Sequence, residues 1–333
     1  MKKILMLTTG GTIASVESED GLVPANESFL NYLGLNRTNH FDLTIKPLLV
    51  LDSSNIQPEE WILIASSIYE DINNFDGIVV THGTDTMAYT AAIISFIIQN
   101  PHIPIVFTGS QVPINSFLTD GIANLRTALE MAQTGVGGVF LAFDRQIILG
   151  TRAVKVRTSS FHAFESINVK PVGTVDSYGL ILNEKHIPAY KDETSFNPVI
   201  ETNVFLLKLT PASNPSIIDL LIQARVKGIV IEAFGAGGMQ FIRRDFVSKI
   251  EKASQAGIPV VITSQCLYEA ANFNIYQVGQ KALNAGAIEA YDMTSEAAVT
   301  KLMWVLGQTK DLKKIRTYFK KNLAGEISDR IIK

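Results

Sequence analysis

The sequence is short of cysteine, of long apolar runs and of any large excess of one charge. Its 333 residues include one cysteine, Cys266, which can form neither an intramolecular disulfide nor a cysteine-based metal site. No apolar stretch approaches the roughly 20 residues of a membrane span. The net charge of −3, with dispersed charges, excludes the basic surface of a nucleic-acid-binding protein. These absences predict a cytoplasmic location and no nucleic-acid or membrane partner.

The first residues do not change this expectation. The apolar run at residues 4–7 is too short for a signal peptide, and no small-residue cleavage pattern follows it. It is predicted to be the first strand. Cys266 is expected to be a small buried residue.

What remains is the composition of a globular chain, with 47% apolar and 18% charged residues. At roughly 150 residues a domain, the length predicts two domains. Short apolar runs alternate with amphipathic segments, a rhythm typical of βαβ units and of a doubly wound, mostly parallel sheet. The first half predicts strands at residues 4–7, 48–51, 77–81 and 103–108, helices at 58–72, 87–99 and 121–133, and a hairpin at 138–150.

A polar stretch that carries Pro198, residues 191–203, is predicted to link two domains. The N-terminal domain, residues 1–190, would be the larger one and would carry the catalytic residues. The C-terminal domain, residues 204–333, would be a smaller, Rossmann-like α/β unit. In it the pattern restarts, with strands at 204–209, 228–232 and 258–263 and helices at 216–224, 245–256, 296–306 and 312–322.

Small polar and hydroxyl residues follow four predicted strands of the first domain. In open α/β sheets, ligands bind beyond the carboxyl ends of the strands, where these residues would converge. Such a group suits a small, polar, zwitterionic ligand. The segments are Thr8-Thr9-Gly10-Gly11-Thr12, Asp52-Ser53-Ser54-Asn55, Thr81-His82-Gly83-Thr84-Asp85-Thr86 and Thr108-Gly109-Ser110-Gln111.

Each segment alone has a structural explanation. Gly10-Gly11 favours a tight turn and fits neither a dinucleotide fingerprint nor a phosphate-binding loop. Asp52-Ser53-Ser54-Asn55 before Pro58, and Thr84-Asp85-Thr86 before an apolar run, resemble helix caps. His82 is more simply a packed, hydrogen-bonded loop residue than a base.

Taken together with Lys155, these segments favour a catalytic site. Lys155 stands between Val154 and Val156, where its stem can be buried and its amine aimed inward. A threonine hydroxyl needs a base or a proton relay before it can act as a nucleophile. Threonine, aspartate and lysine from separate strand ends supply such a relay, since a desolvated lysine can lose its proton.

Two of these segments resemble the signatures of the bacterial-type L-asparaginases. They are Thr9-Gly10-Gly11-Thr12-Ile13-Ala14 and His82-Gly83-Thr84-Asp85-Thr86, and Arg152-x-x-Lys155 lies where that family places its catalytic lysine. The resemblance runs along essentially the whole chain. The segment Asp52-Ser53-Ser54-Asn55 is similar to the corresponding segment in the cytoplasmic type I branch of that family.

The resemblance implies a large N-terminal and a smaller C-terminal α/β domain, with no metal and no organic cofactor. It implies a homodimer or a homotetramer built as a dimer of dimers, with active sites near the subunit contact. The reaction would be hydrolysis of L-asparagine to L-aspartate and ammonia.

The resemblance also implies a role for each site residue. Thr12 would attack the amide carbon and form an acyl-enzyme ester, which water then hydrolyses. Thr84, with Lys155 behind it, would relay protons, and the main chain near Thr84 would help to hold the oxyanion. Asp85 would bind the α-ammonium and Ser53 the α-carboxylate of the substrate, with Asp52 and Ser54 beside them.

The sequence departs from the family pattern at two places. Residues 14–28 would form a lid, and where many members carry a tyrosine hydroxyl this chain has Leu22. Another group or a water would then have to carry the proton to or from Thr12. A glycine-rich turn that supplies an asparagine in secreted relatives reads Gly235-Ala236-Gly237-Gly238 here.

Three other functions stay open. The first is glutamine hydrolysis at the same site, because substrates that differ by one methylene are separated by only about 1–3 kcal/mol. The second is an idle amino-acid-binding protein, against which Thr12, Thr84, Asp85 and Lys155 together argue. The third is a component of a tRNA-dependent amidotransferase, which is expected to carry an N-terminal extension.

Overall fold

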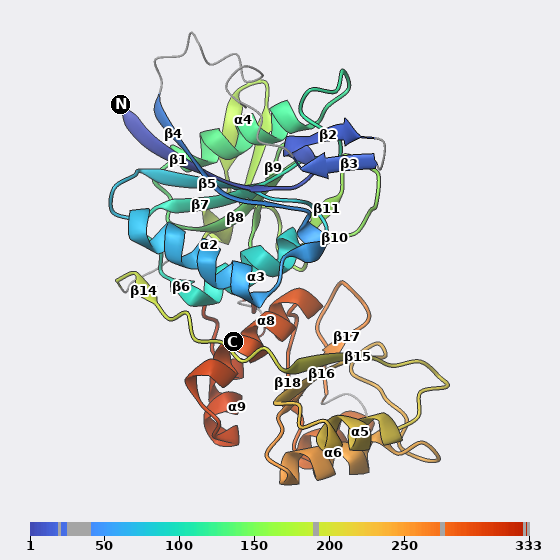
Figure 1. Cartoon of the computed structure of the whole chain (residues 1–333). Coiled ribbons are helices and arrows are strands. Elements are labelled where there is room, and N and C mark those ends of the chain that lie inside the picture. Colours follow the sequence, from blue (N-terminus) through green and yellow to red (C-terminus); the bar gives the residue numbers. More distant parts are fainter. Residues whose placement is uncertain (19–20, 25–40, 189–192, 274–276, 329–330, 332–333) are drawn as a thin grey trace. The chain divides into compact units, whose positions relative to one another are not determined.

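The computed structural model of the chain describes residues 1–18, 21–24, 41–188, 193–273, 277–328 and 331. It divides into two compact units, Met1–Pro198 and Val199–Lys333. Each is an α/β unit built around parallel strands, which confirms the predicted fold class (Figure 1). None of the described helices is both long and apolar enough to cross a membrane.

The first unit is built on an eight-stranded sheet in the order β13-β12-β9-β8-β7-β5-β1-β4. The pairs from β4 to β8 are parallel. The pairs from β8 to β13 are antiparallel, which confirms the predicted hairpin. The strands are β1 (Lys2–Gly10), β4 (Phe41–Leu51), β5 (Gly77–Thr81), β7 (Pro104–Thr108), β8 (Gly138–Phe143), β9 (Gln146–Leu149), β12 (Gly173–Asp176) and β13 (Gly179–Leu182).

Helices cover both faces of this sheet. Every residue of β5, β7 and β8 is buried, which explains why these strands are continuous apolar runs. Helices α2 (Pro58–Asp71) and α3 (Met87–Ile97) lie on one face, and α4 (Gly121–Ala132) lies on the other (Figure 1). The parallel strands therefore end together at one edge of the sheet, where the loops that precede α2, α3 and α4 meet.

Shorter elements surround the sheet, and several were not predicted because two to four residues carry little periodicity. Helix α3 ends earlier than predicted, since Ile98 and Gln99 pair with another strand. The short strands are β2 (Ser15–Ser18), β3 (Gly21–Pro24), β6 (Ile98–Gln99), β10 (Ala153–Lys155), β11 (Phe164–Ser166) and β14 (Ser195–Phe196), and the 3₁₀ helices are η1 (Thr12–Ala14), η3 (Ser53–Asn55) and η4 (Glu184–His186).

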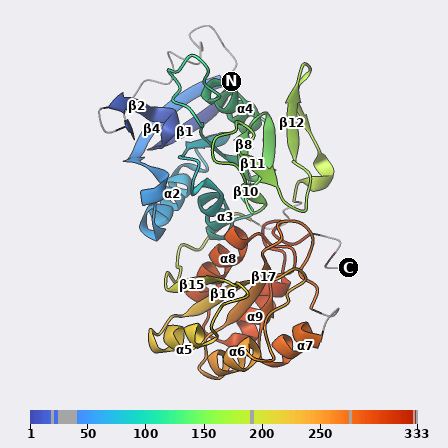
Figure 2. The ribbon, with the colours of Figure 1, turned by 90° about the vertical axis from the view of Figure 1, so that its right-hand side faces the viewer.

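The second unit has a four-stranded parallel sheet in the order β15-β16-β17-β18. Helices α5 and α6 pack on one face and α8 on the other (Figure 2). Cys266 follows β17 and is exposed, so the expectation of a buried cysteine was wrong. The elements are β15 (Val204–Lys208), β16 (Gly228–Ala233), β17 (Val260–Ser264), β18 (Ile288–Glu289), α5 (Ser216–Gln223), α6 (Phe246–Gln255), α7 (Gln277–Asn284), α8 (Ser295–Gln308) and α9 (Leu312–Lys320).

Candidate active site

Glycines bring three strand ends into direct contact. Gly11 has a φ of +78°, and a Cβ on it would lie 2.4 Å from the backbone nitrogen of Gly83. A Cβ on Gly83 would lie 2.6 Å from Oγ of Ser53. The loops after β1, β4 and β5 therefore pack closely, with the backbone of Gly11 against that of Gly83 and the Ser53 side chain against Gly83. This packing places Thr12, Ser53 and Thr84 at the same edge of the sheet.

Lys155 joins this edge from the last position of β10. Its Nζ donates to Oγ1 of Thr84 at 2.7 Å and to Oδ1 of Asp85 at 2.6 Å. The Lys155 side chain is 17% exposed, whereas that of Asp85 is 63% exposed. The lysine stem is thus covered and the amine is directed toward the loop after β5, as expected. Thr84 is buried, and Asp85 offers its carboxylate to solvent.

Ser53 links the loop after β4 to the loop after β5. Its buried Oγ accepts a hydrogen bond from the backbone N–H of Asp85 at 3.2 Å. Its carbonyl accepts from the hydroxyl of Thr86 at 2.7 Å. Thr86 stands at the amino end of α3, but it makes no side-chain cap there because its hydroxyl is bonded to Ser53. The segment therefore ends at the N-cap position of α3, as expected, but the expected side-chain cap is not made.

Asp52 and Ser54 bond to each other on the exposed side of Ser53. The Asp52 carboxylate accepts from the backbone N–H of Ser54 at 2.8 Å and from its hydroxyl at 2.5 Å. Asp52 caps η3 rather than α2, whose first turn is preceded by Gln57.

Thr12 opens η1, directly after Gly11, and is half-buried. The next residue ties this turn to the loop after β7, because the Ile13 carbonyl accepts from the backbone N–H of Ile114 at 3.3 Å. The predicted lid that follows lies partly outside the described residues. Within it, the backbone of β2 and β3 is described as a hairpin, and the side chain of Leu22 lies outside the description.

His82 is a packed loop residue, as expected. Its Nδ1 bonds to the Gly83 carbonyl at 2.7 Å and must donate, because a carbonyl only accepts. Its Nε2 then accepts from the hydroxyl of Thr90 at 3.0 Å, and that hydroxyl accepts from Trp61 at 3.1 Å. Burial lowers the pKa of His82 to about 4, so it is neutral at pH 7 and fixes the loop that carries Thr84.

Gln111 is a member of this site to which the sequence assigned no role. It follows β7, and its Oε1 lies 3.2 Å from Oγ1 of Thr84. Its position directly after a parallel strand, at the sheet edge where the other site residues meet, was the sequence feature that could have assigned it to the site. What the sequence did not show is the direction of its side chain.

The glycine-rich turn of the second unit is a closed loop. The backbone N–H of Phe234 donates to the carbonyl of Gly238 at 2.8 Å, and Gly237 has a φ of +99°. Among the described residues, no cluster of three or more His, Cys, Asp or Glu side chains could hold a metal ion.

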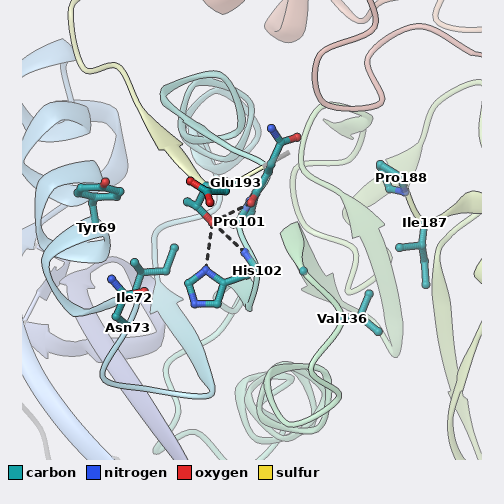
Figure 3. Close-up of a pocket in the computed structure, with 12 residues that line it drawn as sticks. Tyr69, Ile72, Asn73, Pro101, His102, Val136, Ile187, Pro188 and Glu193 are labelled. Carbon is teal, nitrogen blue, oxygen red and sulfur yellow. Dashed lines mark hydrogen bonds between the residues drawn. The ribbon is translucent and has the colours of Figure 1, made fainter. Parts of the chain in front are cut away.

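A pocket of about 700 Å³ lies at the opposite edge of the first sheet (Figure 3). It is lined by residues that precede β5, β7 and β8, so it is formed at the amino ends of these strands. His102 lies within it, with Nδ1 bonded to the hydroxyl of Thr194 at 3.0 Å (Figure 3). None of the predicted site residues lines this pocket. It is therefore separate from the site that contains Thr84 and Lys155.

Comparisons with known proteins agree along both units. The model of the N-terminal asparaginase domain matches residues 3–188, and that of the glutaminase/asparaginase C-terminal domain matches residues 203–319. An L-asparaginase of Thermococcus kodakarensis is 42% identical, with 98% of this chain and 99% of the relative aligned. The thermostable L-asparaginase of that organism has a solved structure that superposes with a TM-score of 0.92, at the same identity and the same coverage.

Two further relatives carry different names. The L-asparaginase 1 of Escherichia coli is 33% identical, with 98% of both chains aligned. A component of the glutamyl-tRNA(Gln) amidotransferase of Methanosphaera stadtmanae is 34% identical, with 98% of this chain and 77% of the relative aligned. The family thus includes proteins named for different amide reactions.

Proposed function

This chain belongs to the asparaginase family of amidohydrolases, and from that premise we propose that it hydrolyses L-asparagine to L-aspartate and ammonia through a threonine acyl-enzyme. The observation that carries the proposal is the contact of Lys155 with both Thr84 and Asp85. It joins a potential base, a hydroxyl relay and an anionic anchor at the strand edge that holds Thr12.

In the proposed first step, Oγ of Thr12 attacks the side-chain amide carbon. The C–N bond breaks, the amide nitrogen takes up the proton that the Thr12 hydroxyl loses and leaves as ammonia, and an ester to Thr12 remains. Thr84 and Lys155 carry the protons of this step, and the main chain near Thr84 helps to hold the oxyanion. In the second step water attacks the ester, which releases aspartate and restores the Thr12 hydroxyl.

The charged groups of the substrate have partners at the same edge. Asp85 would bind the α-ammonium, and its 63% exposure leaves room for a ligand beside Lys155. Ser53 would donate to the α-carboxylate. The backbone of Asp85 uses only an accepting lone pair of the Ser53 hydroxyl, so its proton is left for an acceptor. Asp52 and Ser54 would border the carboxylate from the exposed side.

The proposed assembly is a homodimer or a homotetramer in the cytoplasm. Phe117 is 100% exposed and Leu118 is 73% exposed in the loop between β7 and α4. Neighbouring apolar side chains of this size on a surface are typical of a contact with another chain. The single cysteine, which is free, suits a reducing compartment.

The experiment is ammonia release by the purified chain, with L-asparagine and L-glutamine assayed side by side over a wide concentration range. We expect turnover of free asparagine that is lost in Thr12→Ala and kept in Thr174→Ala, an exposed threonine on β12. A preference for glutamine would move the assignment to the second substrate. Release from neither amide by folded protein would contradict the proposal and favour a binding protein or an amidotransferase component.

A further inference from the structure

The side-chain amide of Gln111 is held in one orientation. Its Nε2 donates to the carbonyls of Thr158 and Ser160, at 3.0 and 3.1 Å. Carbonyl oxygens only accept, so the nitrogen must face these two residues and Oε1 must face away from them. Oε1 therefore points at Oγ1 of Thr84, 3.2 Å away.

This orientation determines where the Thr84 proton lies. The hydroxyl of Thr84 has one proton and two neighbours, Oε1 of Gln111 and Nζ of Lys155. An amide oxygen cannot donate, so Thr84 donates to Gln111 and accepts from the lysine ammonium at 2.7 Å. If Lys155 gives up its proton, the neutral amine competes with Gln111 for the proton of Thr84.

We propose that Gln111 is a positioning residue that directs the Thr84 hydroxyl proton away from Lys155 and so keeps the lysine in its donating state before a substrate reacts. This inference deepens the proposed function and depends on it for the catalytic meaning of the Thr84–Lys155 pair. Gln111 acts through Thr84 and touches no reacting atom.

The loop that carries Gln111 is held by other groups. The Asp120 carboxylate accepts from the backbone N–H of Gln111 at 3.0 Å and from that of Val112 at 3.2 Å. The Asn124 side chain donates to the carbonyl of Gly109 at 3.0 Å and to the Asp120 carboxylate at 3.0 Å. Because these bonds do not involve the Gln111 side chain, substitutions of that side chain are expected to leave the loop and the fold in place.

Two substitutions of Gln111 have opposite expected effects. Gln111→Met removes the acceptor, so the Thr84 proton becomes available to Lys155 and the neutral amine is favoured. Gln111→Glu keeps an acceptor of similar shape and adds a negative charge, so the ammonium is favoured. The matched control is Gln133→Met. Gln133 directly follows α4 and is not one of the site residues.

The test is a titration of the Lys155 Nζ by nitrogen NMR in the whole protein, with the signal assigned by its loss in Lys155→Met. Relative to wild type, we expect the midpoint to move to lower pH in Gln111→Met and to higher pH in Gln111→Glu. Each displacement should be roughly half to one pH unit, the size of one hydrogen bond.

Midpoints that coincide with the wild-type value, or that move in the same direction in both variants, would overturn the inference. If Gln111 had only a structural role, both substitutions would affect the stability of the protein alike and would leave the midpoint of the Lys155 titration in place. Because the titration needs no substrate, it decides the role of Gln111 even if wild type releases no ammonia, an outcome that would defeat the proposed function alone. Circular dichroism of the four variants checks that each is folded.

Discussion

The ammonium of Lys155 contacts two side chains to which different tasks are proposed. Thr84 is proposed to relay protons and Asp85 to bind the substrate ammonium, and Lys155 contacts both residues. A substrate ammonium that reaches Asp85 must share its carboxylate with Lys155 or replace it. Binding would then weaken one of the two contacts that stabilise the charged lysine, which couples arrival of the substrate to release of the lysine proton.

This coupling predicts the behaviour of Lys155→Met. The substitution keeps the covered stem and removes the amine, so kcat is expected to fall at least about 100-fold, as for loss of a general base. KM should not rise, because Asp85 loses a competitor for the substrate ammonium. Steady-state ammonia release gives both constants, and Lys170→Met, at an exposed lysine, is the matched control. Unchanged kcat in Lys155→Met would remove the lysine from the mechanism.

At the residue level, the sequence predicted which side chains gather but not how they bond. Thr84 and Lys155 could be chosen because residues at the carboxyl ends of parallel strands meet at one edge. Gln111 was present in the same set, but its role depends on the carbonyls of Thr158 and Ser160. These carbonyls belong to an irregular turn between β10 and β11, whose path no periodicity predicts.

At the level of elements, the amino end of α8 contains a carboxyl group in an unusual state. Thr294 caps the helix by accepting from the backbone N–H of Ala297 at 3.1 Å. Glu296 lies on the first turn, and burial raises its pKa to about 7, with a smaller contribution from the nearby Glu232 carboxylate. Glu232 itself accepts from the hydroxyl of Ser295 at 2.6 Å and pairs with Lys208 at 3.3 Å.

The raised pKa predicts a pH dependence of stability. The ordinary value of 4.5 applies to the unfolded chain, so the folded chain binds more protons between pH 4.5 and 7. Glu296 therefore contributes stability that is fully present below about pH 4.5 and is lost as pH rises toward 7. Above pH 7, Glu296→Gln should be more stable than wild type, by at most about 3 kcal/mol.

Hydrogen exchange of the α8 backbone amides at pH 5 and pH 8 measures this difference. We expect slower exchange in Glu296→Gln than in wild type at pH 8, after correction for intrinsic rates, and a much smaller difference at pH 5. Glu251→Gln, on α6, is the control at another carboxyl. The same difference at both pH values would contradict the assigned protonation of Glu296.

Elements with several turns or with a long apolar run could be predicted from sequence, and the short ones could not. Strand β5 has the predicted bounds because all five of its residues are buried between helices. Strands β10 and β18 have three and two residues, so their backbone pairing depends on neighbours distant in sequence. Tertiary contacts decide such elements, and a single sequence carries little trace of them.

At the level of the whole molecule, the chain repeats one architecture at two sizes. Both units contain parallel strands joined through helices, and both leave polar loops at the carboxyl ends of these strands. The site residues of the proposed reaction all belong to the first unit. The second unit contains the glycine-rich turn and the acidic amino end of α8. Neither of these contributes a residue to the Thr84–Lys155 contact.

Thr12, and not the lysine-bonded Thr84, is the proposed nucleophile. The most direct measurement is peptide mass spectrometry of protein that has been mixed with L-asparagine and quenched in acid during turnover. A Thr12 nucleophile predicts an aspartyl ester on the peptide that contains Thr12, and no such ester in Thr12→Ala. An ester on the peptide that contains Thr84 would contradict it and would exchange the roles of the two threonines.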